Sequence, residues 1–165
     1  MDKSLVSPCK RFAAVYDGHG GTAVSQYLRN QLFVLLSPEI SQLDAEMDVA
    51  AKSARRLRVA TILNEAVKKL DFEVQTKTEW KFQGHTAVAV LLIDDVIYSV
   101  NVGDSRAVLS RNGDAVEPTQ DHKPNHPQEQ ARIESLGGRV QWYGYVDALG
   151  SFPRCRLCYV VLCSA

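Results

Sequence analysis

FAAVYDGHGG, residues 12–21, joins a β-prone run to a carboxylate, an imidazole and three glycines. Residues two apart on a strand point to the same face, so Asp17 and His19 are placed to reach one site. The glycines remove side-chain bulk and let backbone carbonyls approach an ion or a phosphate. A strand that ends in a glycine turn, with Asp17 facing solvent, is the purely structural alternative, and these ten residues alone favour neither interpretation.

Composition narrows the class of protein. The 165 residues suffice for one domain with a hydrophobic core. Lys and Arg together equal Asp and Glu, and the net charge of zero gives no basis for binding nucleic acid or a membrane surface. No apolar stretch approaches the ~18–20 residues that span a bilayer, and no signal-peptide core follows Met1. We therefore expect a monomeric protein of the cytoplasm or nucleus, with an organelle left open.

Two pairs of residues, one of cysteines and one of histidines, could bind a metal ion, but the sequence around each pair argues against a site. The C-x-x-C at Cys155 and Cys158 would need two further ligands to hold zinc, and no second pair exists. His122 and His126 are four residues apart, as on one face of a helix. The two prolines at 124 and 127 disfavour a helix there, so both are predicted to be loop histidines.

Two helices are predicted after a first strand over residues 11–16. The first covers residues 20–36 and is expected to stop at Ser37-Pro38. The second runs from about residue 44 to 76, because apolar residues recur there at helical spacing. Its predicted buried stripe consists of Leu57, Ala60, Leu63, Val67, Leu70 and Val74.

The pattern changes to β after Gly84. Three successive strands are predicted, over residues 86–93, 96–102 and 105–110. Asp94-Asp95 marks a tight turn, and Asn112-Gly113 is a strong signal for a type I′ hairpin. A short helix over residues 127–136 is expected to be capped by Gly137-Gly138. Helices inserted between strands and followed by a meander predict an α+β fold rather than repeated βαβ units.

In order and spacing these segments resemble the metal-dependent protein phosphatases, the PPM or type 2C serine/threonine phosphatases. The resemblance extends from about Arg11 to Val140 and rests on FAAVYDGHGG (12–21), GHTAV (84–88), NVGDSRA (101–107), DHKP (121–124), Glu129, Arg132-Ile133 and GGRV (137–140). It implies a partial phosphatase domain over residues 1–150, followed by a divergent tail over residues 151–165.

The resemblance also implies a fold and a site. The family fold is a four-layer αββα sandwich, here truncated, with two Mg²⁺ or Mn²⁺ ions in a cleft at one end. By resemblance, Asp17 bridges the ions, the carbonyl of Gly18 binds one of them, and His19 is the general acid. Asp104 matches a ligand of a further, weaker ion, although an Asp after Val-Gly can simply close a turn. Such ions activate water toward phosphoserine and phosphothreonine in protein substrates.

The sequence also departs from the family. The family has an arginine that grips the substrate phosphate and a nearby acidic residue ahead of the Asp-Gly-His segment, and neither is found in residues 1–10. The metal-binding aspartates that follow Gly137-Gly138 in the family are not found either. The alternative is thus a truncated, non-catalytic pseudophosphatase or binding fragment. A zinc module at Cys155 and Cys158 is disfavoured by ligand count. Residues 151–165 are expected to be loosely ordered, without a partner strand.

Overall fold

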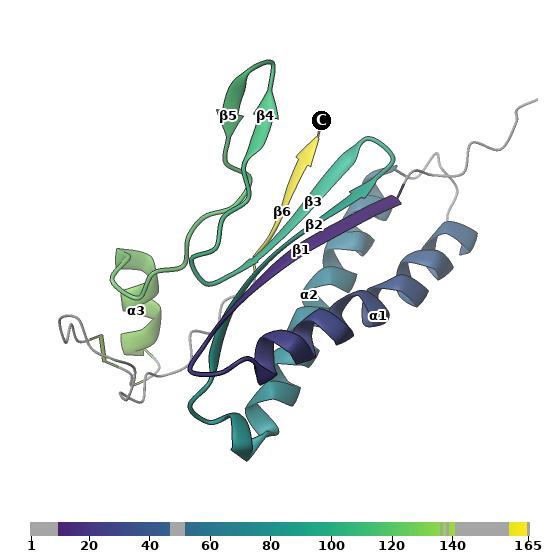
Figure 1. Cartoon of the computed structure of the whole chain (residues 1–165). Coiled ribbons are helices and arrows are strands. Elements are labelled where there is room, and N and C mark those ends of the chain that lie inside the picture. The colour runs from purple at the N-terminus through teal and green to yellow at the C-terminus, as the bar shows by residue number, and fades with distance from the viewer. Residues whose placement is uncertain (1–9, 47–51, 136, 138, 141–158, 165) are drawn as a thin grey trace, which may run out of the picture.

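The computed structural model describes residues 10–46, 52–135, 137, 139–140 and 159–164. A four-stranded antiparallel sheet carries two long helices on one face, and a small hairpin and a short helix follow the sheet in the chain (Figure 1). The elements are β1 (Lys10–His19), α1 (Ala23–Glu46), α2 (Lys52–Thr76), a 3-10 turn (Thr78–Trp80), β2 (Gly84–Ile93), β3 (Val96–Val102), β4 (Leu109–Arg111), β5 (Asp114–Val116), α3 (Pro127–Ser135) and β6 (Tyr159–Ser164).

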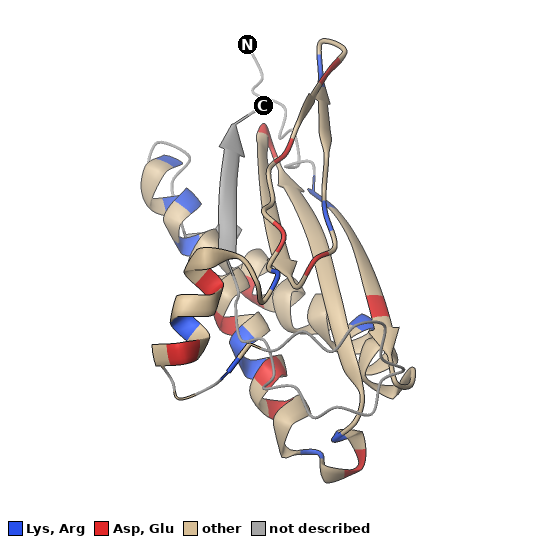
Figure 2. Ribbon diagram, turned by 90° about the vertical axis from the view of Figure 1, so that its left-hand side faces the viewer, with Lys and Arg blue, Asp and Glu red and all other residues tan. Residues whose placement is uncertain are grey.

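The fold is α+β, as predicted. Of the four layers expected, the described residues form one layer of helices and one sheet, in the strand order β1-β2-β3-β6, with β4 and β5 pairing separately. Charged residues lie mainly on the helices and loops, and the strands carry few of them (Figure 2). Within the described ranges, no helix combines the length and the apolar character needed to cross a membrane.

The register gives the sheet two distinct faces. Ala87 of β2 lies between Tyr16 of β1 and Val102 of β3, and these residues belong to the face that packs on the helices, called here the helix face. The adjacent pair is Asp17 opposite Thr86, and because successive residues of a strand point to opposite faces, both belong to the second face. The core lies between the helix face and the buried stripes of α1 and α2.

The first helix does not stop at Ser37-Pro38, as the sequence predicted, but continues through Pro38 to Glu46. A proline inside a helix costs about 3 kcal/mol because it lacks an N–H and crowds the preceding turn. Three apolar side chains continue the buried stripe across this point: Leu36, Ile40 and Leu43, each at most 5% exposed. Burying each of them contributes about 1.5–3 kcal/mol, which offsets the cost of the proline.

Most other elements follow the sequence predictions. The hairpin at Asn112-Gly113 is confirmed, with φ of 54° and 92° as a type I′ turn requires. Gly137 follows α3 with φ of 80°, as predicted for a cap. His122 and His126 lie in a loop. The strand predicted over residues 105–110 is shorter, because the Ala107 N–H donates to the hydroxyl of Thr119 instead of joining a ladder.

Two further predictions are corrected. Leu57 is 68% exposed, so the buried stripe of α2 is instead Val59, Ile62, Leu63, Ala66, Leu70 and Val74. In the tail, Tyr159–Ser164 forms β6 and pairs antiparallel with β3, from Asn101–Tyr159 to Val96–Ser164. The expectation that the tail finds no partner strand is therefore wrong for these six residues. The C-x-x-C lies outside the described residues.

Candidate metal and catalytic site

The residues singled out in the sequence gather at one end of the sheet. β1 ends there at His19, β2 begins there at Gly84, and β3 ends there at Val102. Asp17 and His19 are paired with residues of β2 two positions apart, so both lie on the second face of the sheet. Asp17 of β1 and Asp104, which follows β3, belong to segments on either side of β2 at this end.

Asp104 is held at this end by its two neighbours. The hydroxyls of Thr86 and Ser105 are 2.5 Å apart and hydrogen-bonded. Gly103 has φ of 93°, and a Cβ at that position would lie 2.7 Å from the methyl group of Thr86. Glycine is therefore required there both by its backbone conformation and by the close approach to β2. Asp104 itself is exposed, between two residues that are fixed against Thr86.

The imidazole of His19 lies over the backbone of Gly84, its pairing partner on β2. A Cβ added to Gly84 would overlap the imidazole of His19, with the closest approach at Nε2. Only a residue without a side chain leaves this space to the ring. The orientation of His19 thus depends on Gly84, a link that the sequence did not reveal because the two residues are 65 positions apart.

Gly84→Ala is expected to displace the His19 imidazole while leaving the fold intact. The φ of Gly84 lies outside the left-handed region, so alanine fits the backbone and the conflict is with the ring alone. The measurement is the Cε1–H resonance of His19 in NMR spectra of the wild type and the variant. His126, in the loop before α3, provides an internal control whose resonance should not move. An unchanged His19 resonance would contradict the placement of the ring over Gly84.

The donor set at this end agrees in kind with a site for hard cations. Asp17 and Asp104 supply exposed carboxylates and Gly18 supplies a carbonyl, and Mg²⁺ and Mn²⁺ prefer such oxygen ligands. In number the set is incomplete, because within the described ranges no three His, Cys, Asp or Glu side chains come together closely enough to hold a metal. The described residues thus supply part of a site for these ions.

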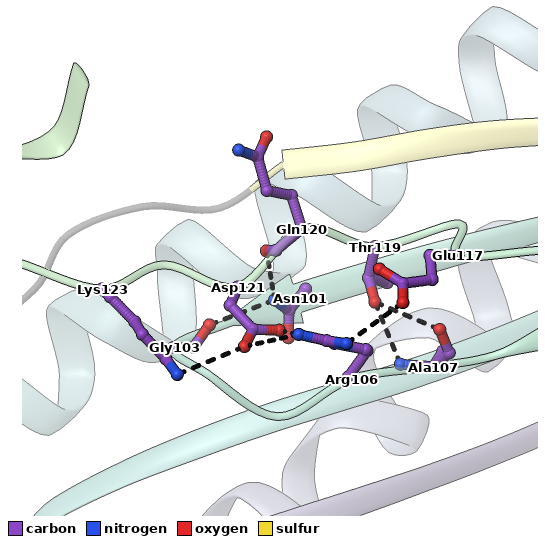
Figure 3. A network of polar contacts seen from close by, with 9 residues as sticks. All are labelled: Asn101, Gly103, Arg106, Ala107, Glu117, Thr119, Gln120, Asp121 and Lys123. Atoms are coloured by element: carbon purple, nitrogen blue, oxygen red, sulfur yellow. Dashed lines mark hydrogen bonds and ion pairs between the residues drawn. The ribbon is translucent and has the colours of Figure 1, made fainter. Parts of the chain in front are cut away.

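A polar network that was not predicted from the sequence fixes the loop beside this site (Figure 3). Arg106 donates from Nε and Nη2 to the two carboxylate oxygens of Asp121, both at 3.0 Å. Its Nη1 donates to Glu117 at 3.1 Å. Lys123 Nζ lies 3.7 Å from Asp121. Arg106, Asp121 and Lys123 lie in the quoted segments 101–107 and 121–124, but the pairing of Arg106 with Asp121 across 15 positions was not apparent from the sequence.

Hydrogen bonds to the carbonyl of Gly103 connect this loop to the candidate site. The buried amide of Asn101 donates to the carbonyls of Gly103 and Gln120, at 3.1 and 2.8 Å. The His122 N–H donates to the same Gly103 carbonyl at 2.8 Å. Burial lowers the pKa of the His122 side chain. The segment 120–122 thereby holds Gly103, and with it the backbone that carries Asp104.

Low pH is expected to weaken the contacts that hold residues 120–122 against Gly103. The hydrogen bonds from Arg106 hold the pKa of the Asp121 carboxyl below its ordinary value of 3.8. A carboxyl with a lowered pKa stabilises the folded loop above its ordinary pKa, and the effect is lost as the pH falls through the lowered value. Protection of the His122 amide from hydrogen exchange should therefore decline below about pH 4. Asp121→Asn should reduce protection already at neutral pH and remove this pH dependence; a variant that retained both would refute the role of the pair.

The arrangement of these elements matches known proteins. The family model described as "Protein phosphatase 2C" matches residues 3–150. The chain belongs to the protein phosphatase 2C family. Probable protein phosphatase 2C 11 of Arabidopsis thaliana is 40% identical over 135 residues, covering 81% of this chain and 33% of that protein. Probable protein phosphatase 2C 75 of the same plant is 37% identical over 145 residues, covering 78% of this chain and 35% of that protein.

The fold also matches solved structures. The serine-threonine phosphatase 2C of Toxoplasma gondii matches with a TM-score of 0.55 and 25% identity, over 79% of this chain and 46% of that one. A sex-determining protein of C. elegans matches with a TM-score of 0.61 and 25% identity, over 82% of this chain and 32% of that one. The chain spans about a third of the length of the curated relatives that it matches.

Proposed function

We propose that this chain carries part of the catalytic centre of a metal-dependent protein serine/threonine phosphatase, within a phosphatase-type region over residues 1–150. The observation that carries the proposal is the juxtaposition at one end of the sheet of Asp17 and His19 from β1 with Asp104 after β3. Membership of a family whose relatives are named protein phosphatases supports it. The proposed substrates are phosphoserine and phosphothreonine in other proteins.

Each residue at this end has a proposed task. The Asp17 carboxylate and the Gly18 carbonyl would hold two Mg²⁺ or Mn²⁺ ions, and Asp104 a further, weaker one. When bound, such ions lower the pKa of water and neutralise charge on the phosphoryl group. His19 would donate a proton to the serine or threonine oxygen as it leaves. Gly84 supports this task, since it leaves the imidazole the space that it occupies over β2.

A second candidate is a non-catalytic chain that binds the substrates or regulators of phosphatases. It is favoured by the ligand count, because the described residues bring two carboxylates and one carbonyl to this end of the sheet. Two hard cations take about six oxygen ligands each, so water would have to provide most of them. A site of that composition is expected to hold Mn²⁺ weakly. The alternative thus makes a definite prediction about metal affinity.

One experiment with the purified chain separates the two candidates. Phosphate release from a phosphothreonine peptide is followed as a function of Mn²⁺ concentration, and Mn²⁺ binding is measured by calorimetry. Multiple turnovers with two ions bound per chain would establish an enzyme. Binding of the peptide without turnover and without saturable Mn²⁺ dependence would favour the second candidate. Asp114→Asn, on the exposed hairpin, is the matched control for loss of one carboxylate.

A further inference from the structure

A cavity of about 470 Å³ lies between the helix face of the sheet and the two long helices. Its floor is formed by Ala87 and Ala89 of β2, whose small side chains leave space unfilled. Leu28 of α1, Leu70 of α2 and Val100 of β3 contribute apolar walls. This volume falls within the range of about 300–1,000 Å³ found for sites of small ligands. We call it the sub-sheet cavity.

The polar residues that line the sub-sheet cavity are Tyr16, Lys68, Asp71, Gln75 and His85. Lys68 and Asp71 of α2 carry opposite charges, and the amide of Gln75 donates to the Asp71 carboxylate at 2.6 Å. On the sheet, Tyr16 lines the cavity and its phenol can donate a hydrogen bond. A charged ligand placed on the alanine floor would lose its hydration among apolar side chains, whereas a neutral one would not.

The position of the cavity links it to the candidate site. Tyr16 and Val102 line the cavity from the helix face. The next residue along each segment, Asp17 on β1 and Gly103 after β3, belongs to the candidate site. Successive residues of a strand point to opposite faces, so only the thickness of the backbone separates the cavity from the site.

We propose that the sub-sheet cavity binds a small, neutral aromatic molecule with one hydrogen-bonding group, and that its occupancy is sensed at the candidate site through β1 and β3. The aromatic body would pack against the alanine floor and the leucine walls. Its polar group would face the phenol of Tyr16. This inference does not depend on phosphatase activity, because binding and its effect on the backbone are both measurable in the chain alone.

Indole is a suitable probe, with an aromatic body and one N–H donor. Titration of the ¹⁵N-labelled chain is expected to give saturable shifts at the amides of Ala87 and Ala89, with a dissociation constant of about 0.1–1 mM. The amides of Asp17 and Gly103 should shift along with them, and that of Gly113 in the β4–β5 turn should not. Indole-3-carboxylate should bind at least ten times more weakly, because its charge would be desolvated.

Two variants and one control test the location. Ala89→Leu fills the floor and should weaken indole binding at least tenfold, whereas Ala13→Leu, the same change on the second face of β1, should leave binding unchanged. Phe72 lines the cavity but is 69% exposed, so Phe72→Ala should preserve the fold and weaken binding severalfold.

The proposal is overturned if the folded wild type shows no saturable shifts up to about 10 mM indole, or if Ala89→Leu binds as well as the wild type. Shifts confined to the cavity amides, with Asp17 and Gly103 unmoved, would refute the link to the site.

Discussion

Replacing Asp17 with asparagine is expected to lower phosphopeptide hydrolysis about a thousandfold, by analogy with the loss of one group that stabilises charge in a transition state. Asp17 is the carboxylate proposed to contact both ions, so neutralising it weakens both metal sites at once. The side chain is exposed at the end of β1, and asparagine has nearly the same shape, so the fold should be preserved. The measurement is the initial rate at saturating Mn²⁺, in a form of the protein that turns over a phosphothreonine peptide.

His19→Ala, compared with Asp17→Asn, separates metal binding from proton transfer. A general acid acts on the leaving oxygen, so His19→Ala should lower turnover while changing Mn²⁺ affinity little. An aryl phosphate with a good leaving group needs less protonation and should be hydrolysed nearly as well by this variant as by the wild type. Substantial activity of Asp17→Asn at saturating Mn²⁺ would contradict the proposed bridging role, and Mn²⁺ release by His19→Ala would contradict the role as acid.

The sequence was sufficient where structure is determined by near neighbours. Asn112-Gly113 predicts its hairpin because few other residue pairs adopt two successive positive φ values, and the structure has them at 54° and 92°. The strands β2 and β3 were predicted because an apolar run on each side of Asp94-Asp95 leaves few alternatives to a hairpin. The face shared by Asp17 and His19 follows from strand alternation once β1 extends to His19.

The sequence was insufficient where distant segments decide the outcome. Proline ordinarily ends a helix, but α1 continues through Pro38 because the sheet and α2 provide a surface for Ile40 and Leu43. Leu57 lies at helical spacing from the core residues, yet it is exposed, because the packing of α2 determines which stripe is buried. The candidate site shows the same limit. Its residues were found from local motifs, whereas the contact of His19 with Gly84 exists only after β1 and β2 pair.

Leu63→Ala should produce the largest loss of stability among single changes in the core, about 2–5 kcal/mol. Leu63 is 1% exposed and belongs to the cluster in which α1, α2 and the sheet meet. Truncation removes buried apolar surface and leaves a void that the surrounding side chains fill only in part. Because small domains are stable by only about 5–15 kcal/mol, the variant should unfold at a much lower urea concentration.

Leu57→Ala is the matched control, since it makes the same change on the same helix at a side chain that is 68% exposed. Exposed substitutions usually alter stability by no more than about 0.5 kcal/mol, so this variant should unfold close to the wild type. Urea unfolding followed by far-UV circular dichroism measures both, and the slope of the transition should stay the same because the surface exposed on unfolding is similar. Equal losses from the two variants would mean that Leu57 is buried as well as Leu63, as in the stripe predicted from sequence, and would contradict the exposure of Leu57 in the structure.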